Sequence, residues 1–120
     1  MEYLSIILIA LVAIEHIYIL VLEMFLWERA RTQQVFGIKK EDVETTKVFA
    51  ANQGLYNGFL AAGLIWGLLH PSAVMGSQIN LFFLSCVLVA ALYGGMTVKK
   101  SILIVQGVPA LLALVSLFLV

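Results

Sequence analysis

The sequence predicts an all-α fold, a four-helix transmembrane bundle formed by a single domain over residues 1–120. Hydrophobic residues make up 62% of the chain and charged residues only 12%, and the mean hydropathy is +1.05. A soluble domain of this size could not bury so much apolar surface. The apolar residues gather into four runs, at about 3–27, 48–69, 79–98 and 101–120. Each run is close to the roughly 20 residues that cross a hydrocarbon core of about 30 Å, and a helix satisfies the backbone of such a segment in lipid.

The first apolar run carries the ionisable side chains of Glu15, His16 and Glu23 at positions expected to lie at lipid depth. An acidic side chain near the middle of a membrane costs roughly 2.5–3.5 kcal/mol, so such residues face a bundle interior and are functional by default. His16 and Glu23 are seven residues apart and share one helix face, whereas Glu15 lies about 100° further round. We therefore expect Glu15 to face one neighbouring helix and the other two residues to face another.

The connections between the runs differ in character. Residues 28–47 are polar and charged, with Gly37 as the expected break, and residues 28–36 are expected to extend the first helix beyond the membrane. Residues 70–78 hold a proline and a glycine but no Lys, Arg, Asp or Glu, and they predict a short turn. The third connection is little more than a pair of lysines.

Basic residues are distributed very unevenly among the connections. All seven lie in two of them: Arg29, Arg31, Lys39, Lys40 and Lys47 in the first, and Lys99 and Lys100 in the third. Because Lys and Arg close to helix ends mark the cytoplasmic side, we expect both termini to lie outside and these two connections to lie in the cytoplasm.

This topology places polar residues of all four helices in the cytoplasmic half of the membrane. The second run begins there, the third ends there with Tyr93 and Thr97, and the fourth begins there. The candidate residues for ligand binding or proton handling are Glu15, His16, Glu23, Asn52, Gln53, Tyr56, Asn57 and Gln106. A structural alternative remains for the amides, which also serve as hydrogen-bonding links between membrane helices.

Glycines on the second run predict close helix packing. Gly54 and Gly58 form one GxxxG pair and Gly63 and Gly67 form another, and small residues at this spacing let helix backbones approach each other.

Composition also argues against several function classes. A net charge of zero gives no indication of a nucleic-acid partner, and the single cysteine, Cys86, excludes an intrachain disulfide or a CxxC motif. Although Glu15, His16 and Glu23 are metal-ligand types, their spacing matches no known ligand pattern, and His70 lies at the opposite depth. The sequence therefore predicts neither a metal nor a cofactor.

Three stretches carry a resemblance to a known family. They are Glu15-His16 through Leu22-Glu23-Met24-Phe25-Leu26-Trp27, then Asn52-Gln53-Gly54-Leu55-Tyr56-Asn57-Gly58-Phe59-Leu60-Ala61-Ala62-Gly63-Leu64, and Gln106-Gly107-Val108-Pro109-Ala110. Over essentially its whole length the chain resembles the family catalogued as domain of unknown function 1304, small bacterial membrane proteins with four helices. The resemblance implies the four-helix fold and a place in the bacterial inner membrane, and it carries no established activity.

Three functional interpretations follow. The leading one is binding or translocation of a small polar or amphipathic ligand, with proton coupling through Glu15 and His16. The second is an intramembrane enzyme that acts on a lipophilic substrate and uses Glu15, His16 or Glu23 as a general acid or base. The third is a structural membrane subunit whose polar cluster only specifies assembly. The expected partners are the lipid bilayer, a small-molecule or lipid ligand, and further copies of the chain.

Overall fold

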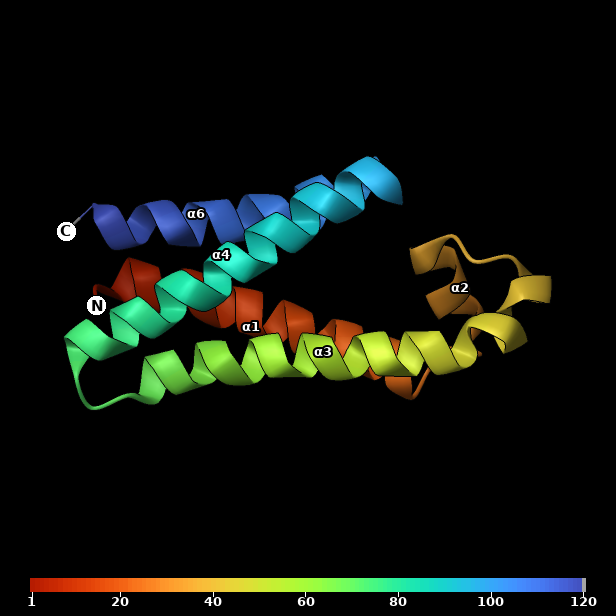
Figure 1. The fold of residues 1–120 in the computed structure, drawn as a ribbon, viewed down its shortest axis with the longest axis horizontal. Coiled ribbons are helices and arrows are strands. Elements are labelled where there is room, and N and C mark those ends of the chain that lie inside the picture. The colour runs from red at the N-terminus through yellow and green to blue at the C-terminus, as the bar shows by residue number, and fades with distance from the viewer. Residues whose placement is uncertain (120) are drawn as a thin grey trace. The chain divides into compact units, whose positions relative to one another are not determined.

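In the computed structural model, which describes residues 1–119, the chain is all-α and these residues contain no strand. The elements, in chain order, are α1 (Tyr3–Met24), α2 (Ala30–Phe36), the 3-10 turn η1 (Lys40–Asp42), α3 (Val43–Leu69), α4 (Ala73–Thr97), α5 (Lys100–Ile102), the π-helical segment η2 (Leu103–Gly107) and α6 (Val108–Phe118) (Figure 1). The predicted all-α class is confirmed. Val120, the expected end of the fourth helix, lies outside the described residues.

Three helical stretches in the described part of the chain are long and apolar enough to cross a membrane, namely Tyr3–Met24, Ala73–Thr97 and Lys100–Phe118. The fourth predicted span, 48–69, lies inside α3, which is not among them. The amides in the first half of α3 lower its hydropathy, although α3 itself, at 27 residues, is long enough to cross. The helices are therefore compatible with a membrane protein.

The first connection folds differently from the prediction. The expected extension of the first helix through residues 28–36 is wrong, because α1 ends at Met24 and α2 is a separate helix. The chain turns so that Trp27 packs with Val43 and Ala50, which a straight helix would not allow. The predicted break at Gly37 is confirmed: its φ of 65° is left-handed, and glycine adopts that conformation at a helix C-terminus without strain.

The second connection is shorter than predicted. Because α4 already begins at Ala73, the predicted turn at 70–78 contracts to the residues around Pro71, and the predicted start at 79 is six residues late. The cause is Ser72, whose Oγ accepts a hydrogen bond from the Met75 N–H at 3.2 Å. A serine in this position satisfies one of the free N–H groups of the first helical turn.

The described residues form two compact units. Unit 1 comprises Met1–Glu15 and the chain from Leu60 onward, and unit 2 comprises His16–Phe59. The boundaries fall inside α1 and α3, so each of these helices contributes a segment to both units.

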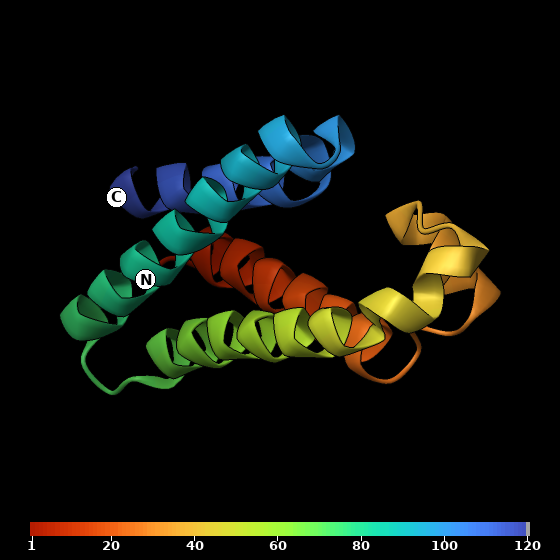
Figure 2. The ribbon, with the colours of Figure 1, turned by 45° about the vertical axis from the view of Figure 1, so that its right-hand side comes forward.

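The core of unit 1 is aliphatic. Its buried members are Ile9, Val12, Ala13, Leu64, Leu84, Val87, Ala110 and Ala113. Within this unit α4 and α6 lie side by side, as Figure 2 also shows. Their connection is tight because a Cβ on Gly95 would come within 2.9 Å of the Leu103 Cβ, so only glycine fits there without a shift.

We predict that the α3–α4 hairpin of unit 1 tolerates no side chain at Gly76. A Cβ there would lie 2.5 Å from the backbone oxygen of Gly67, and backbone cannot rotate away. Gly76→Ala should lower the free energy of unfolding by about 1–3 kcal/mol, the usual cost of overpacking. Gly107→Ala is the matched control, because its Cβ would meet Ala91 and Leu103 at an ordinary 3.5 Å. Denaturant titration in detergent micelles measures both, and equal stability of the two variants would contradict the prediction.

Candidate functional site

The polar contact at the centre of unit 2 joins α1 to α3. Asn57 Nδ2 donates a hydrogen bond to Glu23 Oε1 at 2.6 Å, across 34 residues of sequence. Glu23 is only 7% exposed, so its carboxyl group is buried with this amide as a partner. A buried acceptor left without a donor would cost about 1–3 kcal/mol, so the bond satisfies a group that would otherwise destabilise the unit.

The glycines of α3 make this contact short. A Cβ on Gly54 would lie 2.7 Å from Met24 Cγ, 3.1 Å from Glu23 Cβ and 3.3 Å from the Leu20 backbone oxygen. Gly58, one turn further along, faces the Leu20 side chain in the same way. The predicted close approach at the first GxxxG pair is therefore seen in unit 2, with α1 as the partner helix.

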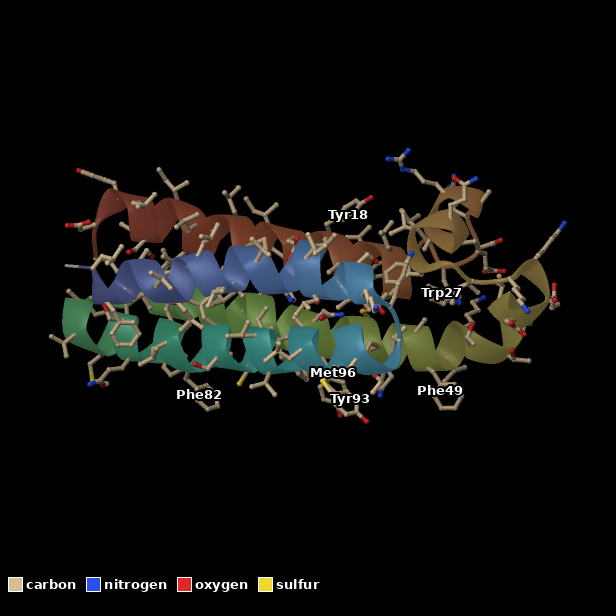
Figure 3. All side chains as sticks on the ribbon, turned by 90° about the horizontal axis from the view of Figure 1, so that it is seen from above. Tyr18, Trp27, Phe49, Phe82, Tyr93 and Met96 are labelled. Carbon is tan, nitrogen blue, oxygen red and sulfur yellow. The ribbon has the colours of Figure 1, made fainter. Side chains whose placement is uncertain are left out.

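Three further contacts join the segment after α1 to α2 and α3. Trp27 Nε1 donates to Thr46 Oγ1 at 3.1 Å, and its ring lies 5.3 Å from that of Phe36, centroid to centroid. Figure 3 shows Trp27 at the end of α1, beside α2. Lys47 Nζ lies 2.8 Å from Glu28 Oε1 in an exposed ion pair. These contacts fix the register of α1 against α3 at the polar end of the unit.

His16 is the first residue of unit 2 and is buried. Its side chain is 1% exposed, and it lies on the same face of α1 as Glu23, about two turns away. His16 and Glu23, predicted to share one face of α1, are therefore both buried. Glu23 also contacts the Asn57 amide of α3. Their roles in ligand binding or proton handling stay predictions.

Three of the predicted site residues do not join this interior. Asn52, Gln53 and Tyr56 are exposed on α3. At the helical repeat, Asn52 and Tyr56 lie on the side away from Gly54, and Gln53 lies about 100° round the helix from it. The Tyr56 ring packs edge-on against Phe59 at a centroid distance of 5.7 Å. The sequence grouped these residues with Asn57 by depth, but depth does not determine which face of the helix a side chain occupies.

The remaining two predicted residues, Glu15 and Gln106, belong to unit 1. Oε1 of Glu15 is buried and has no hydrogen-bond partner among the described residues. Gln106 is partly exposed and lies in η2, where the helix widens into π-helical turns before Pro109. Widened turns of this kind are frequent at functional sites.

Sequence reasoning missed a buried amide in unit 1. Asn80 is 0% exposed, and its Nδ2 lies 3.7 Å from Met1 Sδ while its Oδ1 has no partner in the described chain. A Cβ on Gly67 would collide with this amide, so Gly67 makes room for it, whereas Gly63 makes room for the Phe83 ring. The signal available in the sequence was a single asparagine at the start of an apolar run.

The fold and the site define a class of protein: an all-α chain with apolar helices long enough to cross a membrane and a buried carboxyl–amide pair between two of them. Residues 10–118 match the family described as "Protein of unknown function (DUF1304)", and the chain belongs to that family. It is also 41% identical over 120 residues to the uncharacterized protein YpaA of Lactococcus lactis subsp. lactis (strain IL1403), covering 98% of this chain and 99% of that protein. No solved structure matches the chain.

We predict that Glu23 and Asn57 are energetically coupled. Asn57→Leu leaves a buried carboxyl group without its donor, so it should cost about 1–3 kcal/mol of unfolding free energy. Replacing both partners by leucine removes the unsatisfied group, so Glu23→Leu with Asn57→Leu should cost less than the sum of the single changes, by about 0.5–3 kcal/mol. Denaturant titration of the four proteins in micelles gives this coupling. Additive effects would show that the contact contributes nothing to stability.

Proposed function

We propose that this chain is a four-span integral membrane protein that binds or translocates a small polar or amphipathic ligand through the polar interior of unit 2. The observation that carries the proposal is the buried hydrogen bond from Asn57 to Glu23. His16, about two turns away on the same face of α1, is also buried. A carboxyl group among apolar helices is costly, and proteins keep such groups chiefly where a substrate, an ion or a proton uses them.

The four-span arrangement supports the proposal. Three helical stretches have the required length and hydropathy, and α3, at 27 residues, supplies the fourth crossing with Asn57 turned toward α1. The distribution of the seven basic residues favours a cytoplasmic α1–α3 connection with both termini outside. Glu23 lies close to the cytoplasmic end of α1, so a ligand would reach it from that side.

The chemistry of the pair indicates which ligands fit. The Glu23 carboxyl group retains an oxygen beyond the one that Asn57 bonds, and the Asn57 carbonyl oxygen is an acceptor. Both are suited to an ammonium or hydroxyl group on the ligand. The apolar residues around them suit an amphipathic rather than a highly charged molecule.

We expect Glu23→Gln to separate binding from folding. The glutamine carbonyl can still accept from Asn57, so the fold should persist, whereas the charge that holds a cationic or hydroxyl-bearing ligand is lost. Native mass spectrometry from lipid nanodiscs should detect a bound small molecule on the unaltered protein and none on the variant. Glu28→Gln is the matched control, because Glu28 is an exposed carboxylate paired with Lys47 and should leave the adduct in place. An adduct retained by Glu23→Gln, or absent from all three proteins, would contradict the proposal.

We also propose that Glu15 couples the movement of the ligand to protons, as the sequence predicts, and Glu15→Gln tests this role. Glutamine has the same size as Glu15 but cannot exchange a proton, so we expect unchanged thermal stability and monodispersity together with loss of pH dependence. The measurement is flux of the co-purified ligand into proteoliposomes across a pH series. An unchanged pH profile in the variant would end the role of Glu15 in proton handling, and loss of folding would favour a structural subunit instead.

A further inference from the structure

The turn between α3 and α4 borders a cavity of about 180 Å³ in unit 1. All of its lining residues belong to this unit, and they include Met1, Gly67, His70 and Ser72. Figure 1 shows the first residues of the chain at the same end of unit 1 as this turn. Residues 70–78 hold no Lys, Arg, Asp or Glu, so the turn contributes no charged side chain to the cavity.

The last turn of α3 has backbone acceptors whose helical donors are missing. In a continuing helix the Gly67 carbonyl would accept from the next turn, but the residue in that position is Pro71, which has no N–H. The Leu68 carbonyl would accept from Ser72, whose N–H instead donates to His70 Nδ1 at 3.0 Å. Gly67 and Leu68 both line the cavity, so the carbonyl end of α3, with its partial negative charge, borders it.

The turn and the start of α4 contribute donors to the same cavity. Ala73, the first residue of α4, lines it, and the N–H groups of a first helical turn carry partial positive charge. Because His70 Nδ1 accepts a hydrogen bond, the proton of the neutral imidazole lies on Nε2, which can donate. The Ser72 hydroxyl, whose oxygen accepts from Met75 N–H at 3.2 Å, can donate as well.

A buried amide beside the cavity indicates a ligand that donates hydrogen bonds. Asn80 is 0% exposed, and its Oδ1 has no hydrogen-bond partner in the part of the chain that the structure describes. This oxygen packs on Gly67, where a Cβ would collide with it. Met1, which lines the cavity, has its Sδ 3.7 Å from Asn80 Nδ2. An unbranched thioether side chain rotates easily, so its displacement opens the unsatisfied oxygen to the cavity.

We propose that this cavity binds a zwitterionic group in which a primary ammonium lies beside a phosphate, as in the head of an ethanolamine phospholipid. The ammonium donates to Asn80 Oδ1 and to the carbonyl end of α3, and the phosphate accepts from His70 Nε2–H and the start of α4. A ligand without net charge suits a turn without charged side chains. The turn joins two helices of 27 and 25 residues, each long enough to cross a membrane, and such a turn lies at the depth of lipid headgroups. This site belongs to unit 1 and does not depend on the ligand proposed for unit 2.

The unaltered protein tests the proposal without a substitution. Native mass spectrometry from micelles that contain equal amounts of phosphatidylethanolamine, its mono- and dimethylated forms and phosphatidylcholine shows which phospholipid is retained. Each methyl group replaces one N–H donor, so retention should fall along the series, by about tenfold or more from the first lipid to the last. Equal retention of phosphatidylethanolamine and phosphatidylcholine would overturn the proposal.

A second arm distinguishes a lipid headgroup from a soluble zwitterion. Free O-phosphoethanolamine is added to the protein in micelles that contain phosphatidylcholine alone. Its binding, without retention of phosphatidylethanolamine in the first arm, supports the site and assigns it to a soluble ligand. If neither the free compound nor the ethanolamine lipid binds, the proposal is wrong.

Asn80→Leu then locates the site. The change removes the unsatisfied acceptor, so the preference for the ethanolamine lipid should fall about tenfold or more, whereas thermal stability should be kept or raised. Gln78→Leu is the matched control, because Gln78 is an exposed amide on α4 that does not line the cavity, and its loss should leave the preference unchanged. A preference that survives Asn80→Leu, or that Gln78→Leu abolishes equally, would overturn the proposed site. If Asn80→Leu does not fold, the methylation series on the unaltered protein decides.

Discussion

The hydrogen bond between Asn57 and Glu23 is the constraint on which the arrangement of unit 2 depends. Glu23 is 7% exposed, and a buried carboxyl group without a donor is costly. The 2.6 Å contact with Asn57 requires a close approach of α3 to α1. Gly54 makes that approach possible because any side chain there would meet Met24 and the Leu20 backbone. The bend after Met24, the packing of Trp27 and its bond to Thr46 then hold the polar ends of both helices in the register that the contact requires.

Unit 1 also encloses polar groups among apolar helices, but there they lack a hydrogen-bond partner. Asn80 is fully buried, and Gly67 leaves the space that its amide occupies, but its oxygen finds no partner among the described residues. Glu15 likewise has a buried oxygen without a partner. In each case a polar group is enclosed by apolar helices, and the difference is that unit 2 supplies a donor at the right distance. This difference is why the proposed function centres on Glu23, His16 and Asn57.

Much of the fold could be predicted because apolar runs of about 20 residues and the backbone's need for hydrogen bonds leave little choice but helix. The break at Gly37 could also be read from one residue. Other features could not. The separation of α2 from α1 depends on Trp27 packing against Val43, a tertiary contact that no local pattern encodes. The early start of α4 follows from one serine cap, which was overlooked within a segment interpreted as a turn. Among the site residues, sequence spacing grouped Asn52, Gln53, Tyr56 and Asn57 by depth, and only the structure separates the inward Asn57 from the other three.

The most direct test of this account is a measurement of the Glu23–Asn57 contact in a bilayer. Solid-state NMR on protein reconstituted in lipid, with the glutamate side-chain carboxyl carbon labelled with ¹³C and the asparagine side-chain nitrogen with ¹⁵N, reports their dipolar coupling. The account predicts a coupling at hydrogen-bond distance that disappears in Asn57→Leu and persists in Asn52→Leu. Absence of that coupling in the unaltered protein, or its survival in Asn57→Leu, would contradict the arrangement from which the site and its proposed function are derived.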